Sequence, residues 1–385
     1  MSWMITKDKL DETQRNIIKA LGSEENNLFI QGPAGCGKSV VLIHAVQDLL
    51  DKNEAIKILL VSFTHSLLNL YKSGLRADLH HRVTRCTMQR FKTLPLESYD
   101  YIVIDEVQDI KQPILERLRA SKIPLISAGD YFQSIYDDTC EIDELKSLGN
   151  IKEPILPVIY RNTKSIHAIA SYFSDSPEIY RAYEVDNKQN DTSVQMAEFL
   201  SNIIEVQYTW GKARQIAEAG ESVVIILPNR QKILDFFAEV CRLEDIEPWE
   251  QIEDRYGKPD YDLLNSYCDR HQLPLHYLGN NYGDFQDNND HNRVTVMTYH
   301  SVKGLDFNAV FLPWLTNDMR LWGSAEIERR LFFVALTRAR KELFLSYHGL
   351  PHHFLDLIPE HTASKVLNPN INEVVSDAAY DEVLF

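Results

Sequence analysis

The segment from Gly32 to Ser39 holds the most specific chemistry in the sequence. It follows an apolar run, Leu28–Ile30, and precedes an apolar stretch with helical spacing that begins at Val40. At such a junction, glycines let backbone N–H groups turn inward around phosphates, while a lysine reaches the β and γ phosphates and a hydroxyl joins a Mg²⁺ shell. We therefore expect a nucleoside triphosphate to bind here. The expected binding residues are Gly32, Pro33, Ala34, Gly35, Cys36, Gly37, Lys38 and Ser39.

A pair of acids follows the apolar run Tyr101–Ile104 further along the chain. This pattern is typical of a buried parallel strand that presents carboxylates at its carboxyl edge, where α/β proteins bind ligands. Asp105 is expected to hold Mg²⁺ together with Ser39, and Glu106 is placed to polarise the attacking water. The pair therefore predicts hydrolysis of the triphosphate and not its binding alone.

Further segments in a fixed order give a resemblance to a known family. Together with the two segments above, they resemble the motifs of superfamily 1 helicases of the UvrD/Rep/PcrA type. The resemblance runs, with gaps, from about residue 10 to residue 347. The segments are Leu10–Gln14, Leu59–Thr64, Thr84–Phe91, Gly129–Tyr136, Tyr160–Thr163, Val294–Phe307 and Glu328–Ala339.

The resemblance implies that the nucleotide is ATP and assigns residues to it. Gln14 matches the glutamine that reads adenine, since one amide can pair with both edges of the base. Tyr160 matches a tyrosine that stacks on the base. Gly304 and Asp306 fall in the Lys-Gly-Leu-Asp segment, where Asp306 replaces the glutamate usual in the family.

Three further residues are implied to act in hydrolysis. Gln133 would couple the γ phosphate to the nucleic-acid site, and Arg161 would meet the γ phosphate. Arg338 would be the arginine finger, a cation that can be worth about 10³ to 10⁵ in rate. Because Arg161 and Arg338 lie far beyond the first motifs, both are expected on a second lobe that closes on the nucleotide.

The resemblance also implies contacts with single-stranded DNA, without excluding RNA. Among the expected contact residues, three aromatics have an alternative role, since a ring at a strand end can equally fill the core beneath a sheet. These are Phe63, Phe91 and Tyr136. The complete expected set is Phe63, Thr64, Thr87, Phe91, Tyr136, Thr298 and His300.

The expected fold is α/β, with two RecA-like lobes built on parallel sheets. Alternating apolar runs predict strands that begin near residues 28, 58, 101, 125, 222, 294, 310 and 343, with helices between them. We expect a first lobe over residues 1–155, a second over 156–350 with a short acidic insert at 241–290, and a C-terminal tail from 351 to 385. The tail is predicted to be disordered in preference to a docking peptide.

Composition narrows the remaining possibilities. The net charge of −16 argues against a broad sheath of nucleic acid but leaves room for a narrow groove. Five cysteines without a Cys-x-x-Cys pair favour a reducing cytoplasm over disulfides or a zinc site. No apolar run approaches the roughly twenty residues of a membrane span, so we expect a cytoplasmic protein without membrane contact.

The sequence departs from the family in its nucleic-acid half. No room exists for a first accessory domain between Phe91 and Tyr101, and the acidic insert leaves at most a stub of the second. After Tyr136, Asp137 and Asp138 stand where relatives often place an Arg-Trp pair that stacks a base. The motifs that would bind nucleotide are intact, whereas the expected contacts with single-stranded DNA are fewer than in the relatives.

Two functions therefore stay open. The first is an ATP-driven translocase or helicase on single-stranded DNA that moves 3′ to 5′. The second is a nucleic-acid-gated ATPase that works as a subunit of a larger complex, for instance with a nuclease in phage defence or DNA repair. ATPase stimulation by bare single strands would separate the two.

Overall fold

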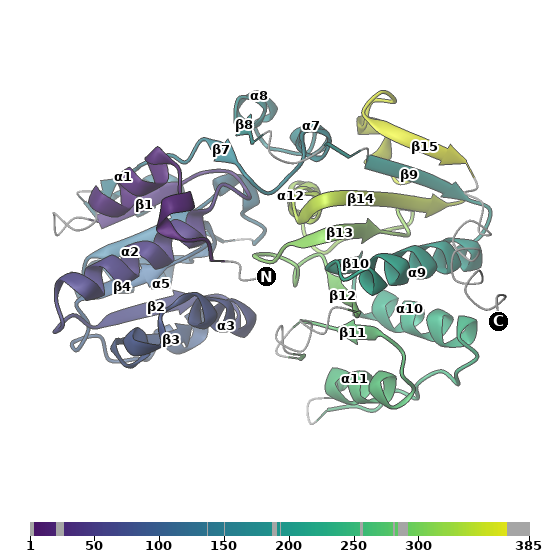
Figure 1. Cartoon of the computed structure of the whole chain (residues 1–385), viewed down its shortest axis with the longest axis horizontal. Helices are drawn as coiled ribbons and strands as arrows, with labels where there is room; N and C mark the ends of the chain where they lie inside the picture. Colours follow the sequence, from purple (N-terminus) through teal and green to yellow (C-terminus); the bar gives the residue numbers. More distant parts are fainter. Residues whose placement is uncertain are drawn as a thin grey trace, which may run out of the picture. The chain divides into compact units, whose positions relative to one another are not determined.

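The computed structural model describes residues 4–20, 27–136, 138–149, 151–186, 191–192, 194–254, 257–279, 282–283 and 292–367. The chain divides into two compact units (Figure 1). The first contains Met1–Arg161 and Ala182–Asp186, and the second contains Asn162–Arg181 and Asn187–Phe385. The boundary therefore follows Arg161 and not residue 155, and it places Tyr160 and Arg161 in the first unit. This corrects the expectation that Arg161 lies on the second lobe.

The first unit is built on a six-stranded sheet in the order β3-β2-β4-β5-β1-β6, and every neighbouring pair is parallel. A separate parallel pair joins β7 (Val158–Ile159) to β8 (Glu184–Val185). The strands of the sheet are β1 (Asn27–Gln31), β2 (Ile58–Ser62), β3 (Val83–Thr87), β4 (Tyr101–Ile104), β5 (Leu125–Gly129) and β6 (Ile151–Lys152).

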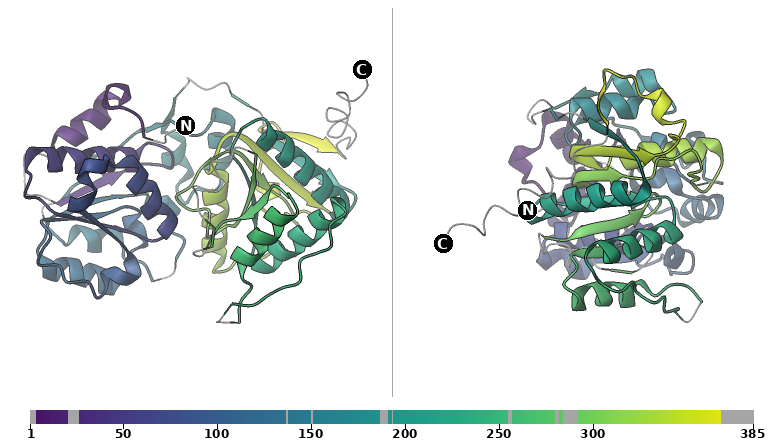
Figure 2. Two further views of the ribbon diagram at one scale, coloured as in Figure 1. Left: turned by 60° about the horizontal axis from the view of Figure 1, so that its bottom comes forward. Right: turned by 90° about the vertical axis from the view of Figure 1, so that its right-hand side faces the viewer.

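Helices cover both faces of this sheet because its strands are apolar on both sides (Figure 2). In β1, for example, Leu28 and Ile30 pack in one core cluster and Phe29 packs in the other. The first cluster contains residues of α1, α2 and α3, and the second contains residues of α4 and α5. The helices are α1 (Glu12–Ala20), α2 (Lys38–Lys52), α3 (His65–Gly74), α4 (Met88–Phe91), α5 (Gln112–Ser121) and α6 (Ile142–Lys146), with 3₁₀ turns at Lys7–Lys9, Ala77–Arg82, Val107–Asp109 and Tyr131–Gln133.

The second unit is built on a seven-stranded parallel sheet in the order β11-β12-β10-β13-β14-β9-β15. The predicted α/β class with parallel sheets is therefore confirmed. The strands are β9 (Val194–Phe199), β10 (Val223–Leu227), β11 (Leu275–Tyr277), β12 (Val294–Thr298), β13 (Phe307–Leu312), β14 (Ala339–His348) and β15 (Ala363–Leu367).

Three helices, α9, α10 and α11, pack over one face of this sheet (Figures 1 and 2). A side chain caps the start of each of them, Ser201 for α9, Asn229 for α10 and Asp260 for α11, by accepting a backbone N–H of the first turn. The helices of the unit are α7 (Lys164–Ser171), α8 (Pro177–Arg181), α9 (Asn202–Glu218), α10 (Arg230–Leu243), α11 (Tyr261–Arg270) and α12 (Ala325–Leu336), with a 3₁₀ turn at Leu355–Leu357.

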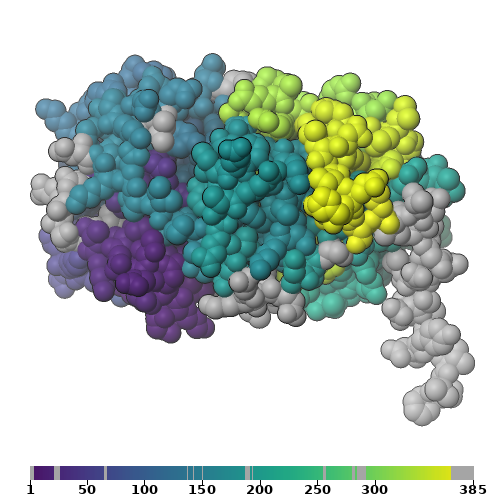
Figure 3. All heavy atoms as spheres, turned by 90° about the horizontal axis from the view of Figure 1, so that it is seen from above, coloured from purple at the N-terminus to yellow at the C-terminus, as the bar shows by residue number. Residues whose placement is uncertain are grey.

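Two segments expected outside the second core belong to it. The described part of the acidic insert forms α11 and β11, because Tyr261, Leu264 and Leu275 pack into the core and β11 pairs with β12. The expected C-terminal tail begins at 351, yet β15 pairs with β9, and residues coloured yellow in Figure 3 form part of the surface of the unit. Residues 368–385 of the predicted tail lie outside the described residues.

The two sheets have the same connectivity. When β11 is set aside, β9, β10, β12, β13, β14 and β15 occupy the positions that β1 to β6 occupy in the first sheet. The match extends to the backbone, since Glu106 and Trp314 are each the second residue after the corresponding strand and both are left-handed, with φ of 57° and 61°. Strands at the same position in the two sheets, such as β3 and β12, are therefore equivalent.

The helices of the described ranges lack the combination of length and apolar character that a membrane span needs. None of them is both long enough and apolar enough to cross a bilayer.

Candidate functional site: a nucleotide site on the first unit

The Gly32–Ser39 loop connects β1 to α2, as the sequence predicts. Gly35 and Gly37 have φ of 77° and 89°, a conformation that side chains rarely adopt. A Cβ added to Gly35 would lie 2.4 Å from the Cβ of Arg161, and Tyr160 donates its N–H to the Gly35 carbonyl at 2.9 Å. Arg161 therefore lies directly against the phosphate loop of its own unit.

Lys38 is buried within the loop that it is expected to serve. Its ammonium group donates to the carbonyls of Gly32 and Pro33 at 2.8 and 2.9 Å. Burial lowers the pKa of Lys38, but the surrounding acidic groups, including Cys36 and Asp130, raise it more, so the net pKa shift is upward. The lysine is thus held as a cation at the centre of the loop.

Cys36 shows none of the features of a reactive thiol. Its side chain is completely buried, and this burial raises its pKa. It fills space beneath the loop.

The carboxylate of Asp105 lies beside the loop and is buried. Ser39 Oγ donates to Asp105 Oδ2 at 2.6 Å, and Tyr71 Oη donates to the same oxygen at 2.5 Å. Burial and the neighbouring Glu106 raise the pKa of Asp105, whereas the two hydrogen bonds lower it. A hydroxyl and a carboxylate in direct contact form the hard oxygen set that Mg²⁺ prefers, so these residues fit the expected ion.

A chain of amide contacts joins Glu106 to the segment that follows β5. Gln108 Nε2 donates to Glu106 Oε2 at 2.6 Å, and Gln108 Oε1 accepts the Asp130 N–H at 3.1 Å. Asp130 in turn accepts Gln133 Nε2 at 2.6 Å. A Cβ on Gly129 would lie 2.5 Å from Gln108 Oε1, so any side chain there would displace the Gln108 amide. Burial is the main reason that the pKa of Asp130 is raised.

Gln14 and Tyr160 also lie against the phosphate loop. Gln14 is buried, donates to the Cys36 carbonyl at 3.2 Å and accepts the Asp11 N–H at 3.1 Å. The Tyr160 hydroxyl donates to the Asp11 carboxylate, and burial raises its pKa. The structure thus brings both residues to the loop, while their roles toward adenine stay predictions.

Arg338 lies in the core of the second unit and is only 1% exposed. Its guanidinium donates to the carbonyls of Val334 and Leu305 at 2.9 and 3.2 Å and to Thr337 Oγ1 at 3.1 Å. These contacts give Arg338 a structural role in this conformation. Its predicted role as an arginine finger stays a prediction.

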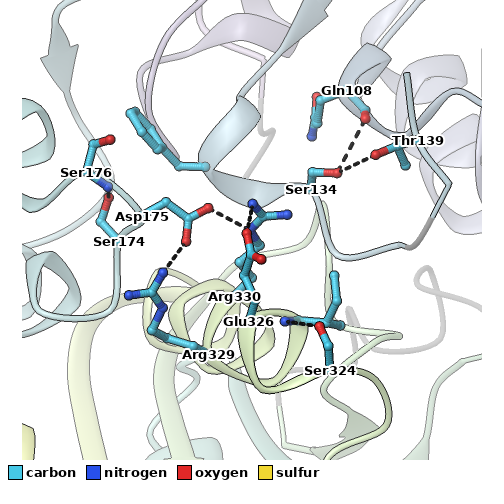
Figure 4. A network of polar contacts seen from close by, with 12 residues as sticks. Gln108, Ser134, Thr139, Ser174, Asp175, Ser176, Ser324, Glu326, Arg329 and Arg330 are labelled. Atoms are coloured by element: carbon cyan, nitrogen blue, oxygen red, sulfur yellow. Dashed lines mark hydrogen bonds and ion pairs between the residues drawn. The ribbon is translucent and has the colours of Figure 1, made fainter. Parts of the chain in front are cut away.

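Two other arginines of the same segment are exposed enough to form ion pairs. Arg329 and Arg330, near the middle of α12, both bind Asp175, at 2.7 and 2.6 Å (Figure 4). Arg330 also pairs with Glu326. The pairs fasten α12 to the segment between α7 and α8, within the second unit.

The Thr298–Asp306 segment follows β12 in the second unit. Thr298 Oγ1 lies 2.8 Å from Ser301 Oγ, and Gly304 has a φ of 85°. Asp306 pairs with Arg340 at 2.6 Å. Burial lowers the pKa of His300. The roles of Gly304 and Asp306 toward nucleotide stay predictions.

The residues of the first unit that are expected to contact nucleic acid differ in how deeply they are buried. Thr64 and Thr87 cap α3 and α4, and Phe63 is partly buried against the core. Tyr136 is also partly buried, and burial raises its pKa to about 12. Phe91 is completely buried and cannot contact single-stranded DNA. This corrects its assignment as a DNA contact and supports the alternative that its ring fills the core. Asp137 lies outside the described residues.

Sequence reasoning missed the connecting residues of this site. Gln108 and Tyr71 have no triphosphate-binding signature of their own, although Gln108 stands two residues from Glu106. In all, the structure brings together Gln14, Gly32–Ser39, Asp105, Glu106, Gln133, Tyr160 and Arg161 on the first unit. It places Arg338, Gly304, Asp306, Thr298 and His300 on the second.

The fold and the site define a nucleotide-binding α/β protein with a phosphate loop. Residues 98–349 match the family described as UvrD-like helicase C-terminal domain, and residues 14–138 match the family described as AAA domain. The first match covers more than half of the chain. The chain therefore belongs to the UvrD-like helicase family.

Curated relatives share limited parts of the chain. It is 34% identical over 117 residues to the ATP-dependent DNA helicase PcrA of Leuconostoc citreum, covering 28% of this chain and 15% of the relative. It is 45% identical over 67 residues to the ATP-dependent DNA helicase Rep of Buchnera aphidicola subsp. Schizaphis graminum, covering 14% of this chain and 9% of the relative. The alignments thus span less than a fifth of these relatives.

A solved structure of an Arterivirus nonstructural protein 10 (helicase) with DNA is 15% identical to the chain. The likeness covers 87% of this chain and 62% of that chain, with a TM-score of 0.43.

Proposed function

We propose that the chain hydrolyses ATP at the phosphate loop of the first unit. The observation that carries the proposal is the continuous set of contacts from Ser39 through Asp105 to Glu106, Gln108 and Asp130. It joins the residues that would hold nucleotide to the segment containing Gln133. Nucleotide binding or hydrolysis at Ser39 and Asp105 could therefore shift the segment that contains Gln133.

Each residue has a role that follows from its surroundings. Lys38, held as a cation in the loop, would neutralise phosphate charge, and Glu106 would orient and polarise the attacking water. Gln108 would keep the Glu106 carboxylate aimed through its 2.6 Å hydrogen bond. Mg²⁺, held by Ser39 and Asp105, would supply charge neutralisation on the phosphate oxygens.

The work that hydrolysis drives is proposed to be movement along single-stranded DNA, in the 3′ to 5′ direction. The candidate DNA contacts support movement along DNA, because Phe63 and Thr64 follow β2, Thr87 ends β3, Thr298 ends β12 and His300 follows it. The direction is taken from the resemblance to UvrD/Rep/PcrA helicases. β3 and β12 occupy matching positions in the two sheets. We propose that both units, as RecA-like lobes, present strand contacts at equivalent edges.

The second candidate is a nucleic-acid-gated ATPase that acts as a subunit, with a nuclease partner in phage defence or repair. Two observations favour it: the net charge is −16, and Phe91 is withdrawn into the core. Both reduce the grip that the chain by itself would have on a strand.

The test is the ATPase rate of the purified chain with and without a bare oligodeoxynucleotide, with Lys38→Ala as the inactive control. A translocase shows stimulation by single strands and displaces a strand from a tailed duplex, weakly as a monomer because the described residues form two units and include no accessory domain to hold the duplex. A gated subunit shows little stimulation by bare single strands and no displacement until its partner is added. Absence of Lys38-dependent ATPase activity under both conditions would reject the proposed hydrolysis.

A further inference from the structure

Trp322 is a large aromatic side chain exposed on the second unit. It is 75% exposed, although its two flanking residues are fixed in place. Leu321 is buried and donates its N–H to Glu328 at 2.8 Å. Gly323 has a φ of 126°, and a Cβ there would lie 2.6 Å from Ile327. The turn therefore presents the indole on a defined backbone.

The start of α12 strengthens this turn. Ser324 caps the helix by accepting the Ile327 N–H at 3.3 Å (Figure 4). The 12-residue helix behind it continues into the core through Leu331 and Phe332. A rigid aromatic loses little conformational entropy when it binds, which suits a contact residue.

Trp322 has an aromatic neighbour in the segment after β12. The ring centroids of Trp322 and His300 are 6.3 Å apart, with an interplanar angle of 61°. His300 Nε2 is buried and has no hydrogen-bond partner among the described residues. Trp322 thus lies beside His300, which the proposed function gives as a contact with single-stranded DNA.

We propose that Trp322 is a base-stacking residue of the single-strand site. The inference rests on the proposed function and names a contact that the helicase motifs do not include. A nucleobase is the occupant that fits, because the exposed indole offers a π-face beside His300, a residue proposed to contact DNA. Stacking on every kind of base makes the contact tolerant of sequence.

Two features of the first unit explain why a stacking ring would be needed on the second unit. The positions after Tyr136 are two acids, Asp137 and Asp138, and Phe91 is buried in the core. Neither position after Tyr136 carries a ring, and Phe91 is not accessible to a nucleobase. Trp322 supplies an aromatic surface on the second unit, beside His300, which follows β12, the strand that matches β3.

The experiment measures the Kd of a fluorescein-labelled oligo-dT by anisotropy for wild type, Trp322→Ala, Trp322→Phe and Leu350→Ala. Leu350 is the matched control, a surface residue of the same unit that is 68% exposed. We expect Trp322→Ala to raise Kd about 5- to 100-fold and Trp322→Phe to recover most of the affinity. Leu350→Ala should bind as wild type.

Two further readouts separate stacking from other causes. The slope of log Kd against log salt should be the same for Trp322→Ala and wild type, because stacking removes no phosphate contact. The Tm should also be unchanged, since the ring is exposed. Wild-type affinity in Trp322→Ala, or an equal loss in Leu350→Ala, would overturn the proposal. A wild-type chain that binds no oligonucleotide would instead reject the proposed strand binding itself.

Discussion

Gln108 holds Glu106 by a 2.6 Å hydrogen bond from its amide Nε2 to the carboxylate Oε2. The same side chain accepts the backbone N–H of Asp130 through Oε1. One amide therefore ties the proposed water-activating acid to the segment after β5. Glu106 has a left-handed backbone with φ of 57°, a conformation that costs free energy in a non-glycine residue and is typical of functional positions.

Replacing Gln108 should slow hydrolysis more than it weakens nucleotide binding. Gln108→Leu keeps the bulk of the side chain but removes both contacts, so Glu106 is no longer aimed. We expect kcat to fall about 10- to 100-fold with a small change in KM for ATP. Gln112→Leu, at an exposed position on α5, is the matched control. A rise in KM without loss of kcat would contradict the positioning role.

Glu106→Gln should remove turnover and retain ATP binding. The amide cannot accept a proton from water, so kcat is expected to fall about 10²- to 10⁴-fold. Lys38 and the backbone of the loop stay in place, and a fluorescent ATP analogue should still bind with near wild-type affinity. Glu116→Gln on the exposed face of α5 serves as the control. Turnover within a few-fold of wild type would remove Glu106 from its assigned role.

Arg338→Ala should destabilise the protein. The substitution leaves the carbonyls of Val334 and Leu305 without their charged donor inside the core. We expect a loss of about 3 kcal/mol in the free energy of unfolding, measured by denaturant titration. Arg340→Ala, at a side chain that is 42% exposed, should cost far less. Retained stability together with lost kcat would instead support the arginine-finger role.

His352 should make stability fall on the acid side. Burial is the main reason that its pKa is lowered to about 4. The folded state then binds fewer protons than the unfolded state between pH 4 and the ordinary pKa of about 6.5. Stability is therefore present above pH 6.5 and is lost as pH falls toward 4, by about 1–3 kcal/mol.

Thermal unfolding between pH 7.5 and 4.5 measures this effect. His352→Gln, which carries no titrating group, should show a shallower dependence of Tm on pH than wild type. Equal slopes in the two proteins would show that His352 does not contribute.

The sequence by itself determined the nucleotide half of the site. A phosphate loop and an acid pair at strand ends are local patterns, because the backbone geometry that binds phosphate is formed by consecutive residues. Apolar runs placed strands such as Leu125–Gly129 for the same reason, since a strand buried on both faces is continuously apolar. The sequence did not show β3, β6, β9, β11 or β15. Four of these are edge strands and β9 lies beside the edge strand β15, so their pairing depends on residues distant in the chain.

The tertiary structure decided which residues meet across the fold. It buried Phe91 and Arg338, assigned Arg161 to the first unit, and joined Glu106 to Asp130 through Gln108. It also left Trp322 exposed although its neighbour Leu321 is buried. Burial and hydrogen-bond partners depend on side chains that pack from other strands and helices, so spacing along the chain carries little information about them.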